Sequence, residues 1–199
     1  MEELWNGVYP AITTKFRQDG SIDYDLFNKN LEYQIECGIH GLVLAGSLGE
    51  TSTLNFDEKQ ELLTNTIETV NGRIPIILNI AEQSTREAIL NAEYAEKSGA
   101  SGLMLLPPMR YKADDRETTT YFKDVAKSTS LPIMIYNNPV DYGIEITFDM
   151  FEEMKFLSLL EKSRLGDPTA APAQETFHCA TLNKGLLFSV IQGRLPVSQ

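Results

Sequence analysis

The sequence predicts an α/β protein built on a parallel β-sheet, and two patterns support this. Apolar runs alternate with helix-like runs at a period of about 30 residues, which is typical of repeated βα units. The apolar runs are continuous, which indicates strands covered on both faces. These patterns leave two arrangements open, an open doubly wound sheet and a (β/α)₈ barrel. The first strand–helix turns carry no G-x-G-x-x-G motif, which argues against a dinucleotide-binding fold.

The first two cycles occupy residues 8–70. Residues 8–14 form a short β-rich run, and a helix is expected over 23–37, with Asp23 as its N-cap and Gly38 as its stop. The helix places its apolar side chains on one face, namely those of Leu26, Phe27, Leu31 and Ile35. A buried strand over 41–45 and a helix over 55–70 follow.

The next three cycles repeat this order. Their strands are expected over residues 74–80, 102–106 and 131–136, and their helices over 84–98, 115–128 and 147–154. The helix over 84–98 begins with a capping-box pattern, Ser84 with Glu87, and ends at Gly99. Polar motifs follow the strands, at the edge where both barrels and open sheets build their sites.

Composition and charge exclude several classes of protein. The 17 basic and 28 acidic residues give a net charge of −11, which disfavours nucleic acid and anionic membranes as partners. Cys37 and Cys179 cannot form a disulfide framework, and with His40 and His178 they show no metal-ligand spacing. The N-terminus lacks the pattern of a signal peptide, and no apolar run could span a bilayer. We therefore expect a cytoplasmic protein without a metal site.

Four motifs carry a resemblance to a known family. They are DGSID at 19–23, GLVLAGSLGET at 41–51, AEKSGASGLMLLPP at 95–108 and LPIMIYNNP at 131–139. Through them the sequence resembles the dihydrodipicolinate synthase/N-acetylneuraminate lyase family over residues 8–156. The resemblance implies a (β/α)₈ barrel and a homo-oligomer, a dimer or a tetramer. It also implies a cofactor-free class I aldolase-type lyase or dehydratase, whose lysine forms a Schiff base with pyruvate or another small 2-keto acid.

The family motifs imply roles for individual residues. Tyr136 matches the tyrosine that transfers protons during Schiff-base formation. Gly46 lets backbone N–H groups approach a carboxylate, Ser47 supplies a hydroxyl and Leu48 a backbone N–H to the same keto-acid carboxylate. Lys162, which precedes Gly166-Asp167 at the family's spacing, is the candidate Schiff-base lysine.

Two departures from the family motifs bear on the substrate. Leu48 stands where many relatives carry a second hydroxyl, and Met109 stands nearest to the place of a relay tyrosine. Arg110 is a candidate for binding a carboxylate or hydroxyl on the distal part of the substrate. These departures favour a sugar-acid or hydroxyproline-derived keto acid over the synthase reaction of lysine biosynthesis.

The C-terminal part suggests an incomplete barrel of about six to seven βα units. Residues 156–161 could form a sixth strand and residues 186–191 a seventh, whereas 166–184 shows no clear helical pattern. Closing the barrel would take roughly 60 more residues. We expect a partial barrel over residues 1–167 and a divergent tail over 168–199.

Each candidate residue also has a purely structural interpretation. Gly46 could serve only a tight turn, Ser47 could be a helix cap, Tyr136 a core-edge aromatic and Lys162 a solvated lysine. The alternative function is therefore a truncated, non-catalytic family member that keeps the scaffold or a keto-acid binding site.

Overall fold

The sheet is mainly parallel and has six strands among the described residues. The computed structural model describes residues 4–108, 112–147, 177–183 and 187–191. The strands follow one another in chain order from β1 to β6, and all neighbours are parallel except β5 and β6. Their bounds are β1 Leu42–Leu44, β2 Ile76–Ile80, β3 Gly102–Leu105, β4 Ile133–Asn137, β5 Phe177–Asn183 and β6 Leu187–Ile191.

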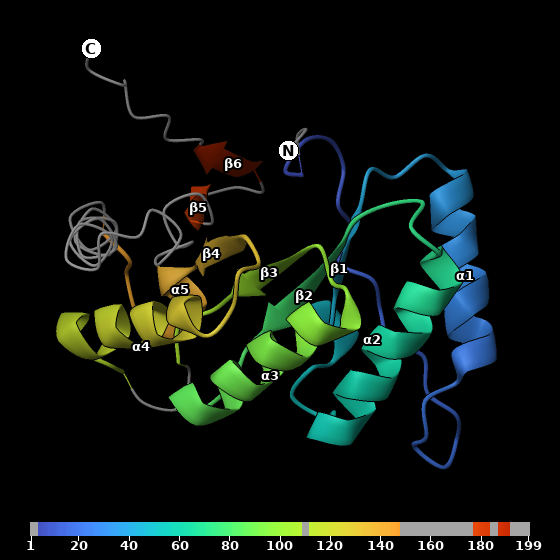
Figure 1. Cartoon of the computed structure of the whole chain (residues 1–199), viewed down its shortest axis with the longest axis horizontal. Coiled ribbons are helices and arrows are strands. Elements are labelled where there is room, and N and C mark those ends of the chain that lie inside the picture. The colour runs from blue at the N-terminus through green and yellow to red at the C-terminus, as the bar shows by residue number, and fades with distance from the viewer. Residues whose placement is uncertain (1–3, 109–111, 148–176, 184–186, 192–199) are drawn as a thin grey trace.

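Four longer helices alternate with the first strands, and two of them begin at the predicted caps, Asp23 and Ser84. They are α1 Tyr24–Glu36, α2 Phe56–Val70, α3 Thr85–Ser98 and α4 Asp115–Lys127 (Figure 1). Capping boxes start α2, at Asn55 with Glu58, and α4, at Asp114 with Glu117. The side chain of Ser84 accepts from the N–H of Glu87 at the start of α3. These bounds agree with the sequence predictions to within one or two residues.

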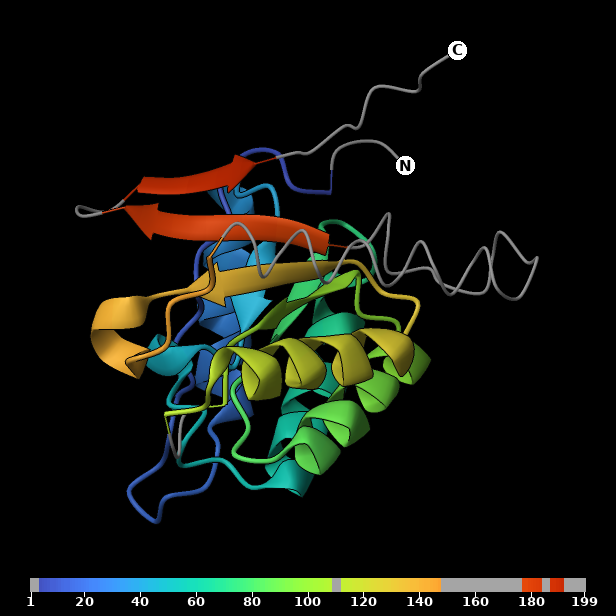
Figure 2. The same cartoon turned by 90° about the vertical axis from the view of Figure 1, so that its left-hand side faces the viewer.

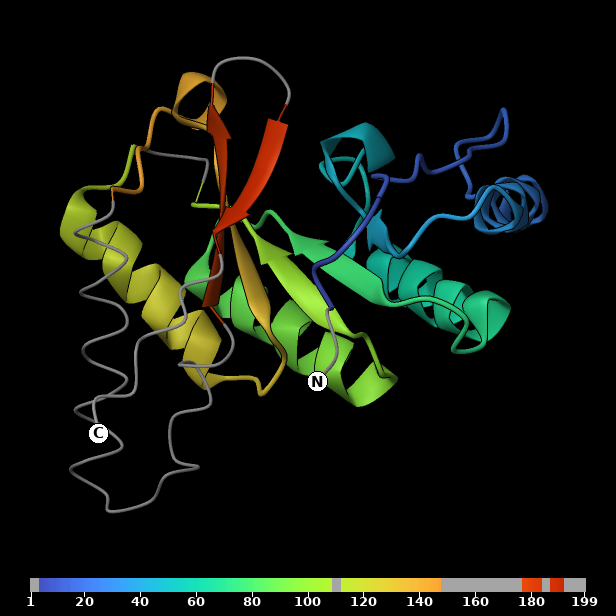
Figure 3. The ribbon, with the colours of Figure 1, turned by 90° about the horizontal axis from the view of Figure 1, so that it is seen from above.

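The helices cover one face of the sheet, and β5 and β6 extend it beyond β4 (Figure 2). The larger apolar cluster joins the helices to alternate strand residues, namely Leu42, Leu44, Ile76, Leu78, Ile80, Leu103, Leu105, Ile133 and Ile135. A smaller cluster lies on the opposite face, around Val43, Ile77, Met104, Leu106 and Met134. Residues of the N-terminal segment, including Trp5 and Tyr9, pack against this smaller cluster. Seen from above, the strands fan round from the side of α1 toward β6 (Figure 3).

The segment 8–14, predicted as a strand, forms only an isolated bridge. Ala11 pairs with Val43, and the bridge is held by Val43 N donating to Pro10 O at 2.9 Å and Ile12 N donating to Val43 O at 3.0 Å. Pro10 has no N–H to extend a ladder, which limits the pairing to this short stretch. The strand that carries Tyr136, predicted as the fifth, is therefore β4.

The C-terminal part differs from the predicted repeat. Residues 166–184, which showed no clear helical pattern, contain β5, which pairs in parallel with β4. β6 lies within the predicted run 186–191 but is antiparallel to β5. Only residues 184–186 separate the two strands, and a parallel pair needs a crossover of a dozen or more residues. The predicted strand 156–161 and all of helix 147–154 except Thr147 lie outside the described residues, and the boundary at 167 stays a prediction.

Candidate active site

The candidate site lies at the carboxyl edge of the sheet. Because β1 to β4 are parallel, the segments that follow them meet at one edge. The turn 46–49 follows β1, Leu106 and Pro107 follow β3, and Tyr136 is the penultimate residue of β4. The structure therefore brings Gly46, Ser47, Leu48 and Tyr136 to the same edge, as predicted.

The turn after β1 is a single 3₁₀ turn, Ser47–Gly49. Gly46 is its N-cap and makes no side-chain capping bond, so Ser47 is not the cap that the structural interpretation proposed. Gly46 and Gly49 are buried, whereas Ser47 and Leu48 are exposed. A Cβ on Gly49 would lie 3.0 Å from the carbonyl oxygen of Ile12, which explains the glycine. The first amides of a helical turn have no acceptor within it, so they are available to a ligand.

Tyr136 lies on the sheet face opposite the helices. Its ring packs against the smaller apolar cluster and meets the ring of Tyr142 edge-on, with centroids 6.1 Å apart. Tyr142 ends the short helix α5, Pro139–Tyr142. Burial raises the pKa of the Tyr136 phenol above its ordinary value, and the charges of Tyr142 and Asp141 act in the same direction. Tyr136 therefore keeps its proton throughout the neutral range and is suited to be a proton donor.

The smaller apolar cluster connects the turn to the phenol. Val43, three residues before Gly46, belongs to this cluster together with Met104 and Met134, and Tyr136 packs against it. The site therefore lies on the sheet face opposite the helices. In a (β/α)₈ barrel this is the inner face, so the position agrees with the predicted architecture.

Three residues considered for the site in the sequence analysis are not among the described ones. Lys162, Arg110 and Met109 fall outside the described residues, so their roles stay predictions. His40 has a structural contact: its Nδ1 accepts from the N–H of Val8 at 3.1 Å. Within the described part of the chain, no group of three His, Cys, Asp or Glu could hold a metal ion. No helix there is long and apolar enough to cross a membrane.

Sequence reasoning missed two side chains that hold the turn. Asn79, in β2, donates from Nδ2 to the carbonyl oxygen of Ala45 at 2.9 Å. Thr14 donates from Oγ1 to the carbonyl oxygen of Gly49 at 2.6 Å. The only signal for Asn79 was an amide inside an otherwise apolar run, IPIILNI, and Thr14 gave none.

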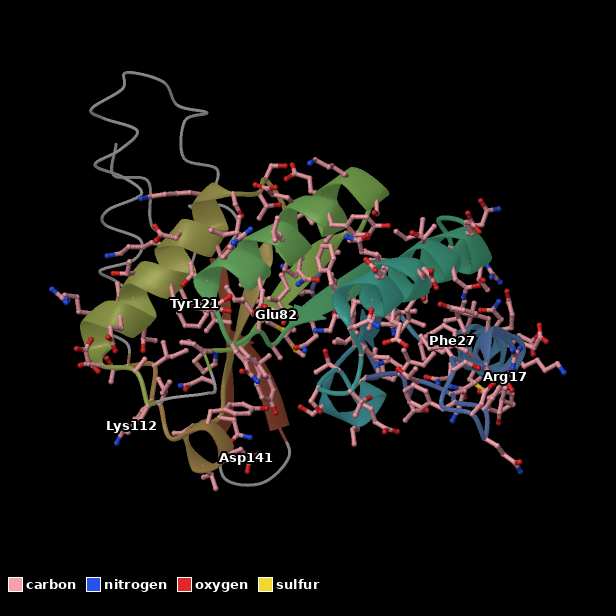
Figure 4. The ribbon with its side chains drawn as sticks, turned by 90° about the horizontal axis from the view of Figure 1, so that it is seen from below. Arg17, Phe27, Glu82, Lys112, Tyr121 and Asp141 are labelled. Atoms are coloured by element: carbon pink, nitrogen blue, oxygen red, sulfur yellow. The ribbon has the colours of Figure 1, made fainter. Side chains whose placement is uncertain are left out.

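A largely buried ion pair in the helix layer was also missed. Lys59 Nζ, from α2, lies 2.6 Å from Glu82 Oε1, two residues beyond β2, and Asn91 donates to the same oxygen at 3.3 Å. In Figure 4, Glu82 lies near the start of α3 and Tyr121 on the neighbouring α4. Burial, reinforced by the charge of Glu82, strongly raises the pKa of the Tyr121 phenol.

Residues 4–160 match the model of the dihydrodipicolinate synthetase family. The chain belongs to this family. The match includes the turn after β1, Tyr136 and the end of β3, and it extends into residues outside the described part. It confirms the family inferred from the four motifs.

Among curated relatives, the chain is 45% identical over 136 residues to 4-hydroxy-tetrahydrodipicolinate synthase of Chelativorans sp. (strain BNC1), covering 68% of this chain and 46% of that protein. Among solved structures, the synthase of Methylacidiphilum fumariolicum SolV is 38% identical with a TM-score of 0.72, covering 74% of this chain and 49% of that one. The chloride-inhibited dihydrodipicolinate synthase of Acinetobacter baumannii, complexed with pyruvate, is 32% identical with a TM-score of 0.72, covering 75% and 51%.

These likenesses confirm the predicted α/β fold of the (β/α)₈ barrel family. The chain spans about half the length of the curated relatives it matches. The curated relatives include synthases of the 4-hydroxy-tetrahydrodipicolinate type and a lyase of Rhizobium meliloti. Neither name contains a sugar-acid or hydroxyproline-derived substrate.

Proposed function

We propose that this protein is a Schiff-base-forming lyase that acts on pyruvate or a small 2-keto acid. The observation that carries the proposal is the phenol of Tyr136, half-buried, with its pKa raised by burial, at the same sheet edge as the turn 46–49. A protonated phenol and a turn with amides available to a carboxylate, at one edge of the sheet, support this proposal, because imine formation on a keto acid uses both together with a lysine amine.

The proposed reaction begins at Lys162. The lysine amine attacks the keto carbon, a C–N bond forms, and the carbonyl oxygen becomes a hydroxyl. Tyr136 donates its proton to this hydroxyl, which leaves as water, and the resulting iminium accepts electrons when a bond to the neighbouring carbon forms or breaks. At neutral pH this requires burial to lower the pKa of the lysine so that a useful fraction is unprotonated.

The substrate carboxylate is assigned to the turn after β1. In this proposal the Ser47 hydroxyl and the Leu48 N–H donate to it, and the buried Gly46 lets the backbone approach. Fixing the carboxylate orients the keto carbon toward the amine, and such positioning accounts for a large part of the rate in two-reactant chemistry.

The second substrate separates two candidates. The names of the relatives favour the 4-hydroxy-tetrahydrodipicolinate synthase reaction. Leu48, which is 69% exposed, stands where many relatives carry a hydroxyl that belongs to the proton relay of the synthases, and the absence of this hydroxyl supports the predicted sugar-acid or hydroxyproline-derived keto acid. Product analysis with pyruvate and each class of second substrate, in both reaction directions, distinguishes them.

The decisive experiment traps the imine. The full chain is incubated with pyruvate and borohydride, and the adduct is located by peptide mass spectrometry. We expect a reduced pyruvate adduct on Lys162, and no mass gain on that residue would contradict the assignment. Binding of pyruvate in calorimetry without turnover would instead support the non-catalytic alternative, a keto-acid binding protein.

Tyr136→Phe tests the proton transfer. Because the phenol acts only in the proton-transfer steps, kcat should fall by about 10²- to 10⁴-fold while pyruvate still binds. The wild-type enzyme should lose activity as pH rises through the raised pKa of Tyr136, above the ordinary value of 10, and the variant should not show this loss. Tyr33→Phe, on the exposed side of α1, is the matched control.

A further inference from the structure

The turn 46–49 is bounded on both sides by strained backbone. Ala45 precedes it and Glu50 follows it, and both have φ of +54°. This left-handed region is unfavourable for residues with a Cβ, because Cβ approaches the following carbonyl. Such strain persists only where surrounding contacts hold the backbone in place, and it concentrates at functional sites.

Two buried side chains supply those contacts, one at each end of the turn. Asn79 Nδ2 donates to the carbonyl oxygen of Ala45 at 2.9 Å, and Thr14 Oγ1 donates to the carbonyl oxygen of Gly49 at 2.6 Å. Asn79 is 4% exposed and Thr14 is 5% exposed, so water does not compete for either bond. The two residues come from separate segments, β2 and the N-terminal stretch, and they fix the turn from two directions.

We propose that Asn79 and Thr14 are positioning residues that hold the turn in its strained form, so that the groups of Ser47 and Leu48 meet the substrate carboxylate preformed. The part that concerns the carboxylate rests on the proposed function. The holding of the turn rests on geometry alone.

A contribution to fold stability does not explain why position 79 is an asparagine. Its Oδ1 is buried and has no hydrogen-bond partner among the described residues. A buried acceptor without a partner destabilises the fold, and an aliphatic side chain would suit a strand whose other residues are Ile76, Ile77, Leu78 and Ile80. What the amide contributes is the hydrogen bond to the carbonyl oxygen of Ala45, which joins β2 to the residue that follows β1.

The test uses near-isosteric variants of the full chain, Asn79→Leu and Thr14→Val. Thr66→Val is the matched control, because Thr66 is also buried and also donates to a carbonyl, that of Leu62, at 2.6 Å, but within α2. Amide hydrogen exchange is measured without ligand, and pyruvate affinity is measured by calorimetry. Loss of either bond should speed exchange of the amides of residues 46–51 and weaken pyruvate binding by about tenfold. Thr66→Val should change neither.

Ala45→Gly provides a second, independent variant. Glycine adopts the left-handed region without strain, so the bond from Asn79 becomes less necessary. The effect of Asn79→Leu on exchange and affinity should therefore be smaller when it is combined with Ala45→Gly than in the wild type, a coupling that a general loss of stability would not produce.

The outcomes separate this inference from the proposed function. Unchanged exchange at residues 46–51 in both variants, equal exchange effects of Thr14→Val and Thr66→Val, or equal effects of Asn79→Leu with and without Ala45→Gly would overturn the inference. Faster exchange together with a wild-type chain that binds no pyruvate would support the holding of the turn and overturn the proposed function.

Discussion

The two faces of the parallel sheet are built from different kinds of side chain. The helix-covered face carries aliphatic strand residues, such as Leu103 and Ile135, which pack into one cluster with α1 to α4. The opposite face also has aliphatic residues, Val43, Ile77 and Leu106, but adds Met104, Met134, the amide of Asn79 and the phenol of Tyr136. Aliphatic side chains with defined rotamers pack closely, whereas methionines adapt and polar groups need partners. The first face is therefore expected to be the more closely packed of the two, and the second one carries the groups to which we assign the proposed reaction.

The strongest test of this comparison is the ion pair of Lys59 and Glu82, which interrupts the aliphatic helix layer. The two side chains are only 10% and 14% exposed. Glu82→Ala leaves the Lys59 charge buried without its partner, and we expect it to lower the free energy of unfolding by about 3–5 kcal/mol. Chemical denaturation measures this. Replacing both residues, as Lys59→Met with Glu82→Leu, should restore most of the loss; if it does not, the pair is needed for more than charge balance.

A smaller effect compares the same change on the two faces. Leu103 and Leu106 are 0% and 1% exposed, but Leu103 faces the helices and Leu106 lies in the cluster with Met104 and Met134. Leu103→Ala should cost about 4–5 kcal/mol, and Leu106→Ala about 2–3 kcal/mol, because methionines can move into the space that is left. Denaturant unfolding of both variants tests the difference. Equal costs would show that the two faces are packed alike.

The same contrast explains which features the sequence could predict. The helix layer followed from local signals, because the side chains that cap its helices bond to backbone three residues further along the chain, as Asn55, Ser84 and Asp114 do. The site edge followed from motifs at strand ends. The role of Asn79 could not be predicted, because it depends on a carbonyl 34 residues away and on a left-handed backbone at Ala45. Continuous apolar runs also conceal which residues face the helices.

The arrangement of the C-terminal strands could not be predicted from the sequence for another reason. β5 lies in an Ala-, Pro- and Thr-rich segment, and its partner β4 is separated from it by residues 138–176. Pairing between such distant segments leaves no local pattern, since the strand is stabilised by its neighbour's backbone. The antiparallel direction of β6 was predictable from the short connection alone, once the position of β5 was known.

The smallest expected effect concerns Glu96, at the outer surface of the helix layer. It extends the comparison of the two sheet faces to the surface, where a carboxylate contributes little to the free energy of unfolding. Glu96, in α3, accepts from Thr129 Oγ1 at 2.8 Å and from Ser130 through both its N–H, at 3.2 Å, and its hydroxyl. The hydrogen bonds of Ser130, followed by that of Thr129, lower the pKa of Glu96 below its ordinary value of 4.5. The folded state therefore favours the charged form.

The sign of the pH dependence follows from this shift. The contribution of Glu96 to stability is complete above its ordinary pKa and is lost as pH falls from 4.5 through the lowered pKa of the folded state. Unfolding free energies measured from neutral pH to about pH 3 should therefore fall less steeply in Glu96→Gln than in the wild type. Glu36→Gln, at the exposed end of α1, controls for the loss of one charge. A decline of the same steepness in Glu96→Gln and the wild type would place the acid sensitivity in other carboxylates and leave the α3 surface without a part in it.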